Sequence, residues 1–356
     1  MEHIQSHDHT IFFSTAEKDF FSELVRKKNY SSVFILVDTN TETHCLAYFL
    51  AHYPCPEKYE VISIDAGEEN KHIQTCTGVW EALSELGADR KSLLINLGGG
   101  VVTDLGGFVA STFKRGIDFI NIPTSLLAMV DASVGGKTGV DLGPLKNQVG
   151  VIINPQAVII DTEFLATLPS NEYRSGYAEM LKHGLIQDAA YWRELSQFNK
   201  INTNQIGKYI HHSVHIKHQV VLQDPRENAL RKILNFGHTL GHAVESYHLI
   251  NERKTTLLHG EAIAIGMIME AYIASVLLAL PKEECDEIKN VFDAIYPKVG
   301  FDEKDFNAIV DLLIYDKKNS HGKVKFALIE AIGNPKWDIE VPNALLKNAF
   351  DYYQRS

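Results

Sequence analysis

Short apolar runs that alternate with helix-like stretches constrain the first half of this chain more than any other feature. Five such runs cover residues 33–37, 61–65, 92–98, 118–125 and part of 157–169. Runs of this length, rich in Val, Ile and Leu, are typical of strands that are buried on both faces. Strands joined through helices make right-handed crossovers and therefore a largely parallel sheet, whose ligands bind beyond the carboxyl ends of the strands.

The pattern changes near Leu168 and Pro169, after which most segments have the periodicity of helices. Residues 324–329 alone indicate a late strand or one arm of a hairpin. A length of 356 residues also favours two domains. We therefore expect an α/β domain over residues 1–168 and a mainly α-helical domain over residues 169–356.

The composition excludes several classes of protein. The formal charge of -11 argues against a nucleic-acid surface, although a local basic pocket could still bind an anionic substrate. The N-terminus lacks the basic and apolar segments of a signal peptide. The cysteines form no C-x-x-C pair, so we expect reduced thiols in a cytoplasmic protein: Cys45, Cys55, Cys76 and Cys285.

The longest apolar run, residues 262–280, could be mistaken for a membrane span. Glu261 stands at its start, Glu270 lies in its middle, and no basic cluster flanks it. An ionisable side chain at the centre of a bilayer is costly, whereas a helix buried on all sides needs the same apolar composition. We therefore expect a core helix of a soluble protein and no membrane partner.

A glycine-rich turn at residues 98–100 follows the third run and opens an apolar helix. Glycines there let the backbone approach a pyrophosphate, and the helix N-terminus offers unpaired N–H groups. Asp38 ends the first run, where a carboxylate can bind ribose hydroxyls and disfavours a 2′-phosphate, so NAD is favoured over NADP. Glu68 and Lys71 could add ribose contacts or form a solvated ion pair, and the sequence leaves both open.

A second glycine-rich segment, from Arg115 to Asn147, places lysines beside flexible backbone. Lys137 follows two glycines, and Lys146 stands directly before Asn147. Such a segment can hold a phosphate or a carboxylate. Asp131 lies among apolar residues and needs a partner, which one of these lysines could be. The alternative is an irregular loop with surface lysines.

A histidine-rich stretch begins at Arg231 and Lys232, which offer a cationic entrance. His238 and His242 are four residues apart, so they share one face of a helix and can reach one metal or one substrate. His259 is a third candidate ligand on the C-terminal side of the pair. The stretch is therefore the strongest candidate for a functional site.

Glu179 offers a different ligand set. It lies on a predicted helix next to Lys182 and His183. If the fold brings Glu179 to His238 and His259, one carboxylate and two imidazoles would leave zinc an open fourth position, as in catalytic sites. Spacing alone instead nominates the i,i+4 histidine pair, and the sequence does not choose between the two sets.

Seven segments along the chain carry a specific resemblance to a known enzyme family. They are NLGGGVVTDLGGFVAS, RGIDFINIPTSLLAMVDASVGGKTGVDL, LKNQVG, YAEMLKHG, LNFGHTLGHAVE, HGEAIAIGM and DKKN. In this order they resemble the 3-dehydroquinate synthase family of the sugar-phosphate cyclase superfamily, over nearly the whole chain. The resemblance implies a Rossmann-like α/β domain followed by an α-helical domain, an active site in the cleft, and a homodimer.

The reaction implied is that of a carbon–oxygen lyase in the shikimate pathway, which leads to chorismate and the aromatic amino acids. The phosphorylated sugar acid 3-deoxy-D-arabino-heptulosonate 7-phosphate is converted to 3-dehydroquinate and phosphate. The family uses transient oxidation by NAD, elimination of phosphate, re-reduction and intramolecular aldol closure. A divalent metal, Zn2+ or Co2+, polarises the hydroxyl that is oxidised.

The resemblance also assigns a role to each candidate residue. The metal ligands would be Glu179, His238 and His259, and the catalytic residues would be His242, Glu227 and Lys182. NAD would be lined by Asp38, Asn40, Glu68, Lys71, Gly99, Gly100, Val101, Asp104, Thr124, Ser125, Lys146 and Thr167. The substrate phosphate would be held by Arg115, Lys137, Asn147 and Lys317 or Lys318, and its carboxylate and hydroxyls by Asp131, Lys182, Lys217, Arg231 and Asn235.

Two features depart from the family pattern. Ser175 stands where many members have asparagine and is left out of the predicted site, and the segment between His242 and His259 is a few residues longer than is common. Two alternatives share the fold: a related sugar-phosphate cyclase, whose substrate lacks the carboxylate, and a metal- and NAD-dependent polyol dehydrogenase, which needs no phosphate clamp. Arg231 and Asn235 favour the dehydroquinate reaction over the related cyclase.

Overall fold

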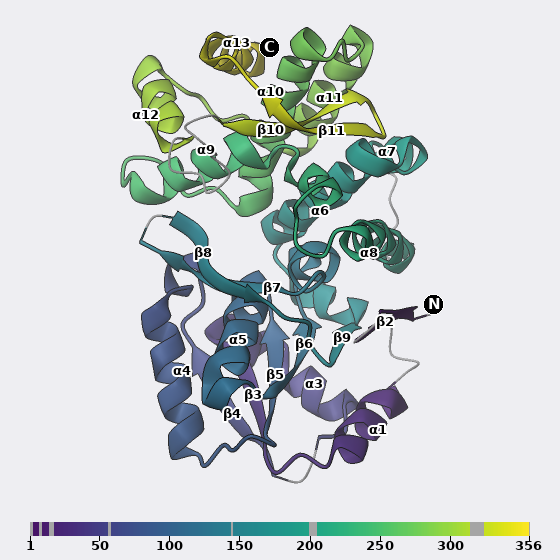
Figure 1. The fold of residues 1–356 in the computed structure, drawn as a ribbon, viewed down its shortest axis with the longest axis vertical. Coiled ribbons are helices and arrows are strands. Elements are labelled where there is room, and N and C mark those ends of the chain that lie inside the picture. Colours follow the sequence, from purple (N-terminus) through teal and green to yellow (C-terminus); the bar gives the residue numbers. More distant parts are fainter. Residues whose placement is uncertain are drawn as a thin grey trace. The chain divides into compact units, whose positions relative to one another are not determined.

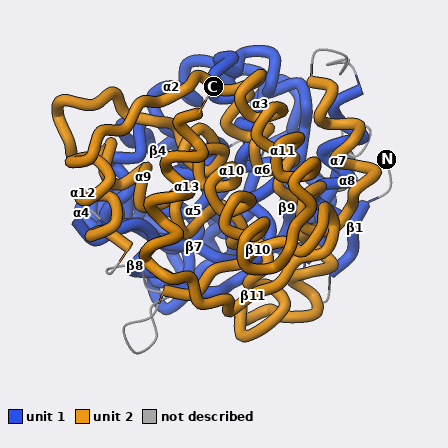
Figure 2. Tube along the Cα trace, turned by 90° about the horizontal axis from the view of Figure 1, so that it is seen from above, with its two compact units in different colours: residues 1–173, 204–215 blue, residues 174–203, 216–356 orange. Residues whose placement is uncertain are grey.

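The computed structural model describes residues 3–6, 9–13, 18–55, 58–143, 145–198, 205–313 and 324–355. They form two compact units, which Figure 2 shows in different colours. Unit 1 comprises residues 1–173 and 204–215, and unit 2 comprises residues 174–203 and 216–356.

Unit 1 is built on a seven-stranded sheet with the order β1-β2-β9-β6-β5-β3-β4. All neighbouring strands are parallel except β1 and β2. The bounds are β1 (Ile4–Gln5), β2 (Thr10–Phe13), β3 (Val33–Asp38), β4 (Glu60–Ile64), β5 (Leu93–Gly98), β6 (Asp118–Pro123) and β9 (Ala157–Ile160). The five apolar runs therefore form the predicted parallel sheet, and β3 and β5 are buried along their whole length.

Helices lie on both faces of this sheet, as Figure 1 shows, with α4 and α5 on one face and α1 and α3 on the other. Their bounds are α1 (Lys18–Lys28), α2 (Thr39–His44), α3 (Leu46–His52), α4 (Ile73–Glu85) and α5 (Gly100–Thr112). One continuous core joins Leu36 and Leu94 of the sheet to Leu83 of α4 and Leu105 of α5. Burial of this apolar surface is the main force that holds the α/β layers together.

The second glycine-rich segment, for which an irregular loop was the alternative interpretation, leads into an antiparallel ribbon. Strand β7 (Lys137–Leu142) pairs with β8 (Leu145–Ile152), with Gly139 opposite Gly150. A Cβ on Gly150 would lie 2.2 Å from the Thr138 carbonyl oxygen, so glycine permits the close approach of the two backbones. The glycines that suggested a loop are thus part of a strand pairing.

The chain from residue 170 onward is mainly helical, as predicted. The helices are α6 (Ser170–Gln187), α7 (Ala189–Leu195), α8 (Ile206–Gln223), α9 (His238–Ile250), α10 (His259–Leu277), α11 (Lys282–Ile295), α12 (Glu303–Leu313) and α13 (Asn343–Gln354). The predicted late strand is β10 (Lys325–Ala331), which forms a hairpin with β11 (Asn334–Glu340).

Helix α10 is the apolar run that resembled a membrane span. It has the length and composition to cross a membrane, but 72% of its apolar window is buried inside the structure, as expected of a core helix. Glu270, in its middle, is fully buried. Its carboxylate accepts the N–H groups of Gly237 at 2.7 Å and Leu240 at 3.0 Å, and so caps the first turn of α9 from a neighbouring helix.

Candidate functional site

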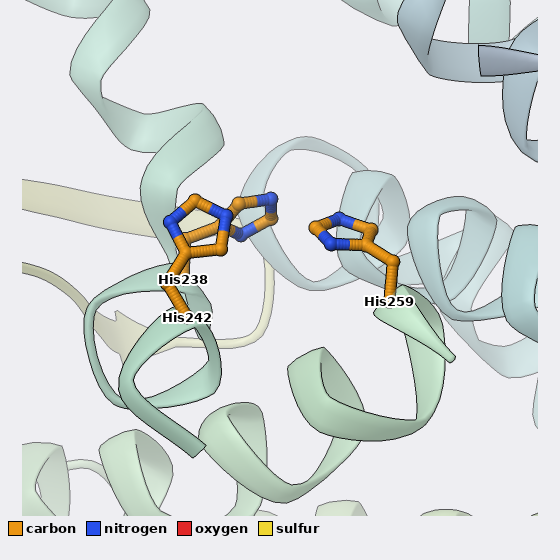
Figure 3. A group of neighbouring side chains, drawn as sticks. All are labelled: His238, His242 and His259. Carbon is orange, nitrogen blue, oxygen red and sulfur yellow. The ribbon is translucent and has the colours of Figure 1, made fainter. Parts of the chain in front are cut away.

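Four side chains of unit 2 converge on one point. His238 is the first residue of α9, His242 lies one turn later, and His259 is the first residue of α10. Figure 3 shows the three imidazole rings gathered together. Their ring centroids are 5.1, 5.5 and 5.7 Å apart. Glu179, fully buried in α6, brings its Oε1 to 3.5 Å from His238 Nε2 and 3.8 Å from His259 Nε2.

The donor set of Glu179, His238 and His259 fits a divalent metal. Ligand atoms about 2.1 Å from a tetrahedral zinc ion lie roughly 3.4 Å from one another, close to the two distances observed. Glu179 Oε1 is buried and accepts no hydrogen bond from any residue that the structure describes. A buried carboxylate oxygen without a donor is costly, and a bound cation would remove that cost.

The two imidazoles are held so that Nε2 faces Glu179. His238 Nδ1 lies 3.1 Å from the Phe236 carbonyl oxygen, and His259 Nδ1 lies 3.2 Å from Glu245 Oε2. In metal sites the second ring nitrogen of a ligating histidine commonly donates to a carbonyl or carboxylate, which fixes the tautomer and the ring orientation. The geometry is therefore that of two histidines prepared to bind a metal through Nε2.

Glu245 was not among the residues predicted from the sequence. It follows His238 by seven residues and His242 by three, so the three side chains share one face of α9. This i, i+4, i+7 spacing is the signal by which it could have been found.

A second ligand set uses the same point. His238, His242 and His259 each offer a nitrogen, and these nitrogens lie within 4.8 Å of one another. The i,i+4 pair that spacing nominated therefore reaches the same place as the set with Glu179. His238 and His259 belong to both sets, which differ only in whether Glu179 or His242 completes them.

Ser175, which was left out of the predicted site, fixes the start of α10. Its hydroxyl accepts the Gly260 N–H at 2.9 Å, one residue after His259. A Cβ on Gly260 would lie 2.0 Å from the Ser175 carbonyl oxygen, so that only glycine permits this approach of α10 to α6. Glu179 lies one turn after Ser175 on α6, and this contact therefore sets the separation of Glu179 and His259.

The segment between α9 and α10 is held by defined contacts. Lys254 Nζ donates to Asp305 Oδ2 of α12 at 2.6 Å. His248 Nδ1 lies 2.7 Å from the Thr255 carbonyl oxygen. These contacts anchor two adjacent residues in the middle of the segment that leads into His259.

Two lysines that were predicted to contact substrate are buried in unit 2. Lys182 is 1% exposed and Lys217 is 6% exposed. Lys182 forms an ion pair with Glu179 Oε2 across one turn of α6. This places its ammonium group beside the candidate metal ligands, as a role in catalysis requires.

Asn235 and Glu227 contact each other just before α9. Asn235 Nδ2 donates to Glu227 Oε1 at 2.5 Å. Glu227 has a left-handed backbone, with φ of 59°. Residues other than glycine adopt this region at an energetic cost, and strained residues of this kind cluster at functional sites. Asn235 therefore holds the Glu227 carboxylate in a fixed position, and Asn235 itself lies only three residues before His238.

The expected cationic entrance at Arg231 and Lys232 takes a different form. Arg231 is 2% exposed, and its Nη1 donates to the Pro225 carbonyl oxygen at 2.8 Å. Lys232 forms an ion pair with Asp338 at 2.7 Å. Arg231 is thus a buried, positioned cation, while Lys232 joins the short 3-10 helix Leu230–Asn235 to β11.

In unit 1, Lys71 is the centre of a polar group. Its Nζ donates to Asp104 Oδ2 and Asn147 Oδ1, both at 2.7 Å, while Lys146 donates to Glu68 Oε1 at 2.9 Å. Glu68 and Lys71 form the i,i+3 ion pair that the sequence left open, with Lys71 Nζ 3.9 Å from Glu68 Oε1, but Lys71 is 4% exposed, so the expectation that this pair is solvated is wrong. Burial lowers the pKa of Lys71, but the surrounding carboxylates together raise it above its ordinary value. Burial also raises the pKa of Asp104, although Lys71 opposes that shift.

Asp38 ends β3, as predicted, at the carboxyl edge of the sheet. Its Oδ1 accepts the Thr41 N–H at 2.8 Å and thereby caps α2. Asn40 is exposed in the first turn of the same helix. The carboxylate is therefore fixed where ligands of parallel sheets bind.

The Cys45 thiol contacts two residues that were predicted to line NAD, Thr124 and Thr167. Burial raises the pKa of its thiol to about 11, and hydrogen bonds with Thr124 and Thr167 partly offset that shift. The Thr124 N–H donates to the Gly98 carbonyl oxygen at 3.0 Å. Thr124, Thr167 and the glycine turn therefore lie at the same end of the sheet.

The glycine turn after β5 has the predicted arrangement. Gly99 is the N-cap of α5, which begins with Gly100 and Val101. A Cβ on Gly99 would lie 3.4 Å from Ser125 Oγ, so this hydroxyl lies close to the backbone of the turn. Unpaired N–H groups at a helix N-terminus, together with a hydroxyl, can bind a pyrophosphate.

Three residues predicted to hold phosphate lie on the surface of unit 1. Arg115 ends a short 3-10 helix before β6, Lys137 begins β7, and Asn147 lies in β8. Arg115 and Asn147 have left-handed backbones, with φ of 73° and 52°. The Asn147 N–H donates to Asp141 Oδ1 at 2.7 Å, which links this residue to the polar group around Lys71.

The remaining candidates are Asp131 and two late lysines. Asp131 is half-buried in a π-helical turn, Ala128–Ala132, in unit 1. Lys317 and Lys318 lie outside the residues that the structure describes.

Two family models match the chain. The 3-dehydroquinate synthase N-terminal model matches residues 61–175, and the 3-dehydroquinate synthase C-terminal model matches residues 176–319. A 3-dehydroquinate synthase of Parabacteroides distasonis is 40% identical over 341 residues, which cover 95% of each chain. Another, of a Sulfurovum species, is 40% identical over 324 residues, which cover 91% of each chain.

Solved structures share the fold over its whole length. A 2-deoxy-scyllo-inosose synthase, complexed with carbaglucose-6-phosphate, NAD+ and Co2+, has a TM-score of 0.82 at 26% identity and covers 98% of both chains. A 2-epi-5-epi-valiolone synthase of Streptomyces hygroscopicus, with NAD+ and Zn2+ bound, has a TM-score of 0.84 at 25% identity. The alignment covers 99% of this chain and 98% of that one.

Proposed function

The chain belongs to the 3-dehydroquinate synthase family, and we propose how its side chains divide the work of that reaction. It is a phosphate-eliminating carbon–oxygen lyase that converts 3-deoxy-D-arabino-heptulosonate 7-phosphate to 3-dehydroquinate. Its cofactors are NAD and a divalent metal, Zn2+ or Co2+, which supply a reversible hydride acceptor and a Lewis acid when they are bound.

The proposed metal ligands are Glu179, His238 and His259. The observation that carries this proposal is the convergence of Glu179 Oε1 on the two Nε2 atoms, at 3.5 and 3.8 Å. Support also comes from the burial of the Glu179 carboxylate and from the hydrogen-bond acceptors that face Nδ1 of His238 and Nδ1 of His259. Three protein ligands leave a place for one substrate hydroxyl.

The proposed proton-transfer residues are His242, Glu227 and Lys182. His242 lies one turn from His238, which puts its ring within reach of a hydroxyl at the metal-binding point. Glu227, held by Asn235, is a second acceptor. Lys182, beside Glu179, can donate to a substrate oxygen that gains negative charge.

NAD binding is assigned to unit 1. The glycine turn and the α5 N-terminus would bind the pyrophosphate, and Asp38 would bind ribose hydroxyls. The full proposed set is Asp38, Asn40, Glu68, Lys71, Gly99, Gly100, Val101, Asp104, Thr124, Ser125, Lys146 and Thr167. Support comes from the network around Lys71, which joins residues far apart in sequence into one fixed group.

The substrate carries a phosphate at one end and a carboxylate at the other, so its binding needs cationic side chains near both groups. The phosphate would be bound by Arg115, Lys137 and Asn147, with Lys317 or Lys318 from the DKKN segment. The carboxylate and hydroxyls would be bound by Asp131, Lys182, Lys217, Arg231 and Asn235. Such contacts hold the anionic substrate in one orientation and stabilise the enolate charge that develops while phosphate is eliminated.

We also propose a cytoplasmic homodimer, with cofactor-binding residues in 1–168 and metal- and substrate-binding residues mainly in 169–356. The four cysteines are free thiols, which supports a reducing compartment. Leu142 and Ile152 of the β7–β8 ribbon are 57% and 54% exposed, which supports a partner surface there. Light scattering after size exclusion would give twice the chain mass, and a monomer mass would refute the dimer.

Phosphate release from the heptulosonate phosphate, by purified protein with NAD and Zn2+, tests the proposal. We expect stoichiometric 3-dehydroquinate and no accumulation of NADH, because the hydride returns to the substrate. Net NADH formation from a polyol would indicate a dehydrogenase instead. Turnover of a sugar phosphate without a carboxylate, and none of the heptulosonate, would indicate a related cyclase.

A further inference from the structure

Glu245 is a buried carboxylate that faces the candidate metal ligand His259. It is 5% exposed, and its Oε2 lies 3.2 Å from His259 Nδ1. Burial of a carboxylate is unfavourable unless hydrogen bonds or opposite charge compensate it. The burial of Glu245 carries a cost that the contact with His259 offsets, and a carboxylate kept buried against this ring points to a role for Glu245 at this position.

We propose that Glu245 is the positioning residue of His259: it holds the Nδ1–H tautomer and aims the Nε2 lone pair at the metal-binding point. A carboxylate accepts from Nδ1–H, and in a neutral imidazole this makes Nε2 the nitrogen that carries the lone pair. On the other side of the ring, Nε2 lies 3.8 Å from Glu179 Oε1. The His259 ring therefore lies between two carboxylates, with Nδ1 facing Glu245 and Nε2 facing Glu179.

His259 needs this support more than His238 does. The His238 side chain is 10% exposed and that of His259 is 22% exposed, so packing restricts the His259 ring less. His238 Nδ1 faces a neutral carbonyl, whereas His259 Nδ1 faces a charged carboxylate, which is the stronger acceptor. His259 is also the first residue of α10, and the positive end of that helix stabilises a nearby carboxylate.

Glu245 also couples the two helices that carry the histidines. It lies on the same face of α9 as His238 and His242, yet it contacts the first residue of α10. The inference rests on the proposed metal site, because a fixed tautomer matters only if Nε2 binds a metal. Glu245 is then a positioning residue that acts through His259.

The test is the Zn2+ affinity of Glu245→Gln, measured by competition with a chromophoric chelator. Loss of such an outer contact weakens metal binding by about 10- to 100-fold, and we expect a change of this size. Glu245→Asp, which keeps the charge, should recover part of the affinity. Thermal unfolding of the metal-free variants checks that the fold is retained, and the absorption spectrum of the Co2+ forms reports the ligand field directly.

Glu261→Gln is the matched control. Glu261 is also in the first turn of α10, but its Oε2 accepts the Leu258 N–H at 2.9 Å. We expect it to lower thermal stability while Zn2+ affinity stays within about twofold, since no imidazole tautomer depends on it.

The double variant Glu245→Gln, His259→Ala decides whether Glu245 acts through His259. We expect no further loss of Zn2+ affinity beyond that of His259→Ala alone, because the two residues form one unit. An additive loss, or a Glu245→Gln affinity within about twofold of wild type, would overturn the inference. Failure of the wild-type protein to bind Zn2+ would instead refute the proposed metal site, so the two failures are distinguishable.

Discussion

Lys254 donates a 2.6 Å hydrogen bond to Asp305, and so ties the segment that leads into His259 to helix α12. Asp305 also accepts the Tyr247 hydroxyl at 2.5 Å and the Asp302 N–H at 2.8 Å. Three donors on one nearly buried carboxylate make a rigid junction between α9, α12 and the intervening segment. The segment between α9 and α10 is therefore part of the folded structure of unit 2.

Asp305→Asn should destabilise unit 2 in a pH-dependent way. Burial raises the pKa of Asp305, but the hydrogen bonds from Lys254, Tyr247 and Asp302 together lower it below its ordinary value. A carboxyl whose pKa is lowered by folding stabilises the protein above its unfolded pKa, and this contribution disappears as the pH falls through the folded pKa. We expect a loss of about 1.5–3 kcal/mol at pH 7.

Thermal melts of wild type and Asp305→Asn from pH 7 to pH 3 measure this effect. The difference in melting temperature should be largest at neutral pH, should begin to shrink below roughly pH 4, where the carboxyl of the unfolded chain becomes protonated, and should disappear as the pH falls through the lower pKa of the folded protein. Asp351→Asn is the control, because its ion pair with Lys347 is exposed and 3.9 Å long, and should change stability little. A constant difference across the pH range would contradict the assignment.

Gly260→Ala should weaken metal binding without touching a ligand. The new Cβ would lie 2.0 Å from the Ser175 carbonyl oxygen, so α10 must move away from α6. That movement separates His259 from Glu179, and we expect at least a tenfold loss of Zn2+ affinity together with a lower melting temperature. Gly78→Ala, in helix α4, has nothing within 4 Å of its Cβ and should stabilise the protein slightly. Equal metal affinity in both variants would show that the contact does not position His259.

The sequence predicted most of the scaffold because burial on both faces leaves a direct signal. Runs such as Val33–Asp38 are apolar at nearly every position, and they became the central strands. Thr10–Phe13 is only four residues long and was missed. The β7–β8 ribbon was missed because Gly139 and Gly150, which allow its strands to approach, are also what a loop contains.

The site was predictable only in part. Spacing indicated His238 and His242 because helix geometry places residues four apart on one face. Glu179 is far from both histidines in sequence, so only the family resemblance connected it to them. Glu245 shares the helical spacing of the histidines, but its contact with His259 of another helix is set by tertiary packing, as are the contacts of Glu270 with the start of α9, and the sequence does not show these contacts.

Glu270→Gln should destabilise the start of α9. The buried carboxylate accepts two backbone N–H groups, and an amide can accept only through its oxygen while its NH2 group faces the other donor. We expect a loss of about 1.5–3 kcal/mol and faster amide exchange at Gly237 and Leu240. Hydrogen exchange followed by mass spectrometry measures this locally. Unchanged protection of the first turn of α9 would show that the cap contributes little.

Metal content separates the two candidate ligand sets around His238 and His259. If Glu179 is the third ligand, Glu179→Gln should lose Zn2+, whereas His242→Ala should keep it and lose activity, because His242 then transfers protons. If the three histidines bind the metal, His242→Ala should lose Zn2+ instead. Elemental analysis after dialysis against a weak chelator gives the metal content, and phosphate release gives the activity. We expect full metal content in His242→Ala with turnover reduced by about 100-fold or more, since general acid–base catalysis contributes factors of this size. A metal-free His242→Ala protein beside a metal-loaded Glu179→Gln protein would reverse the two assignments.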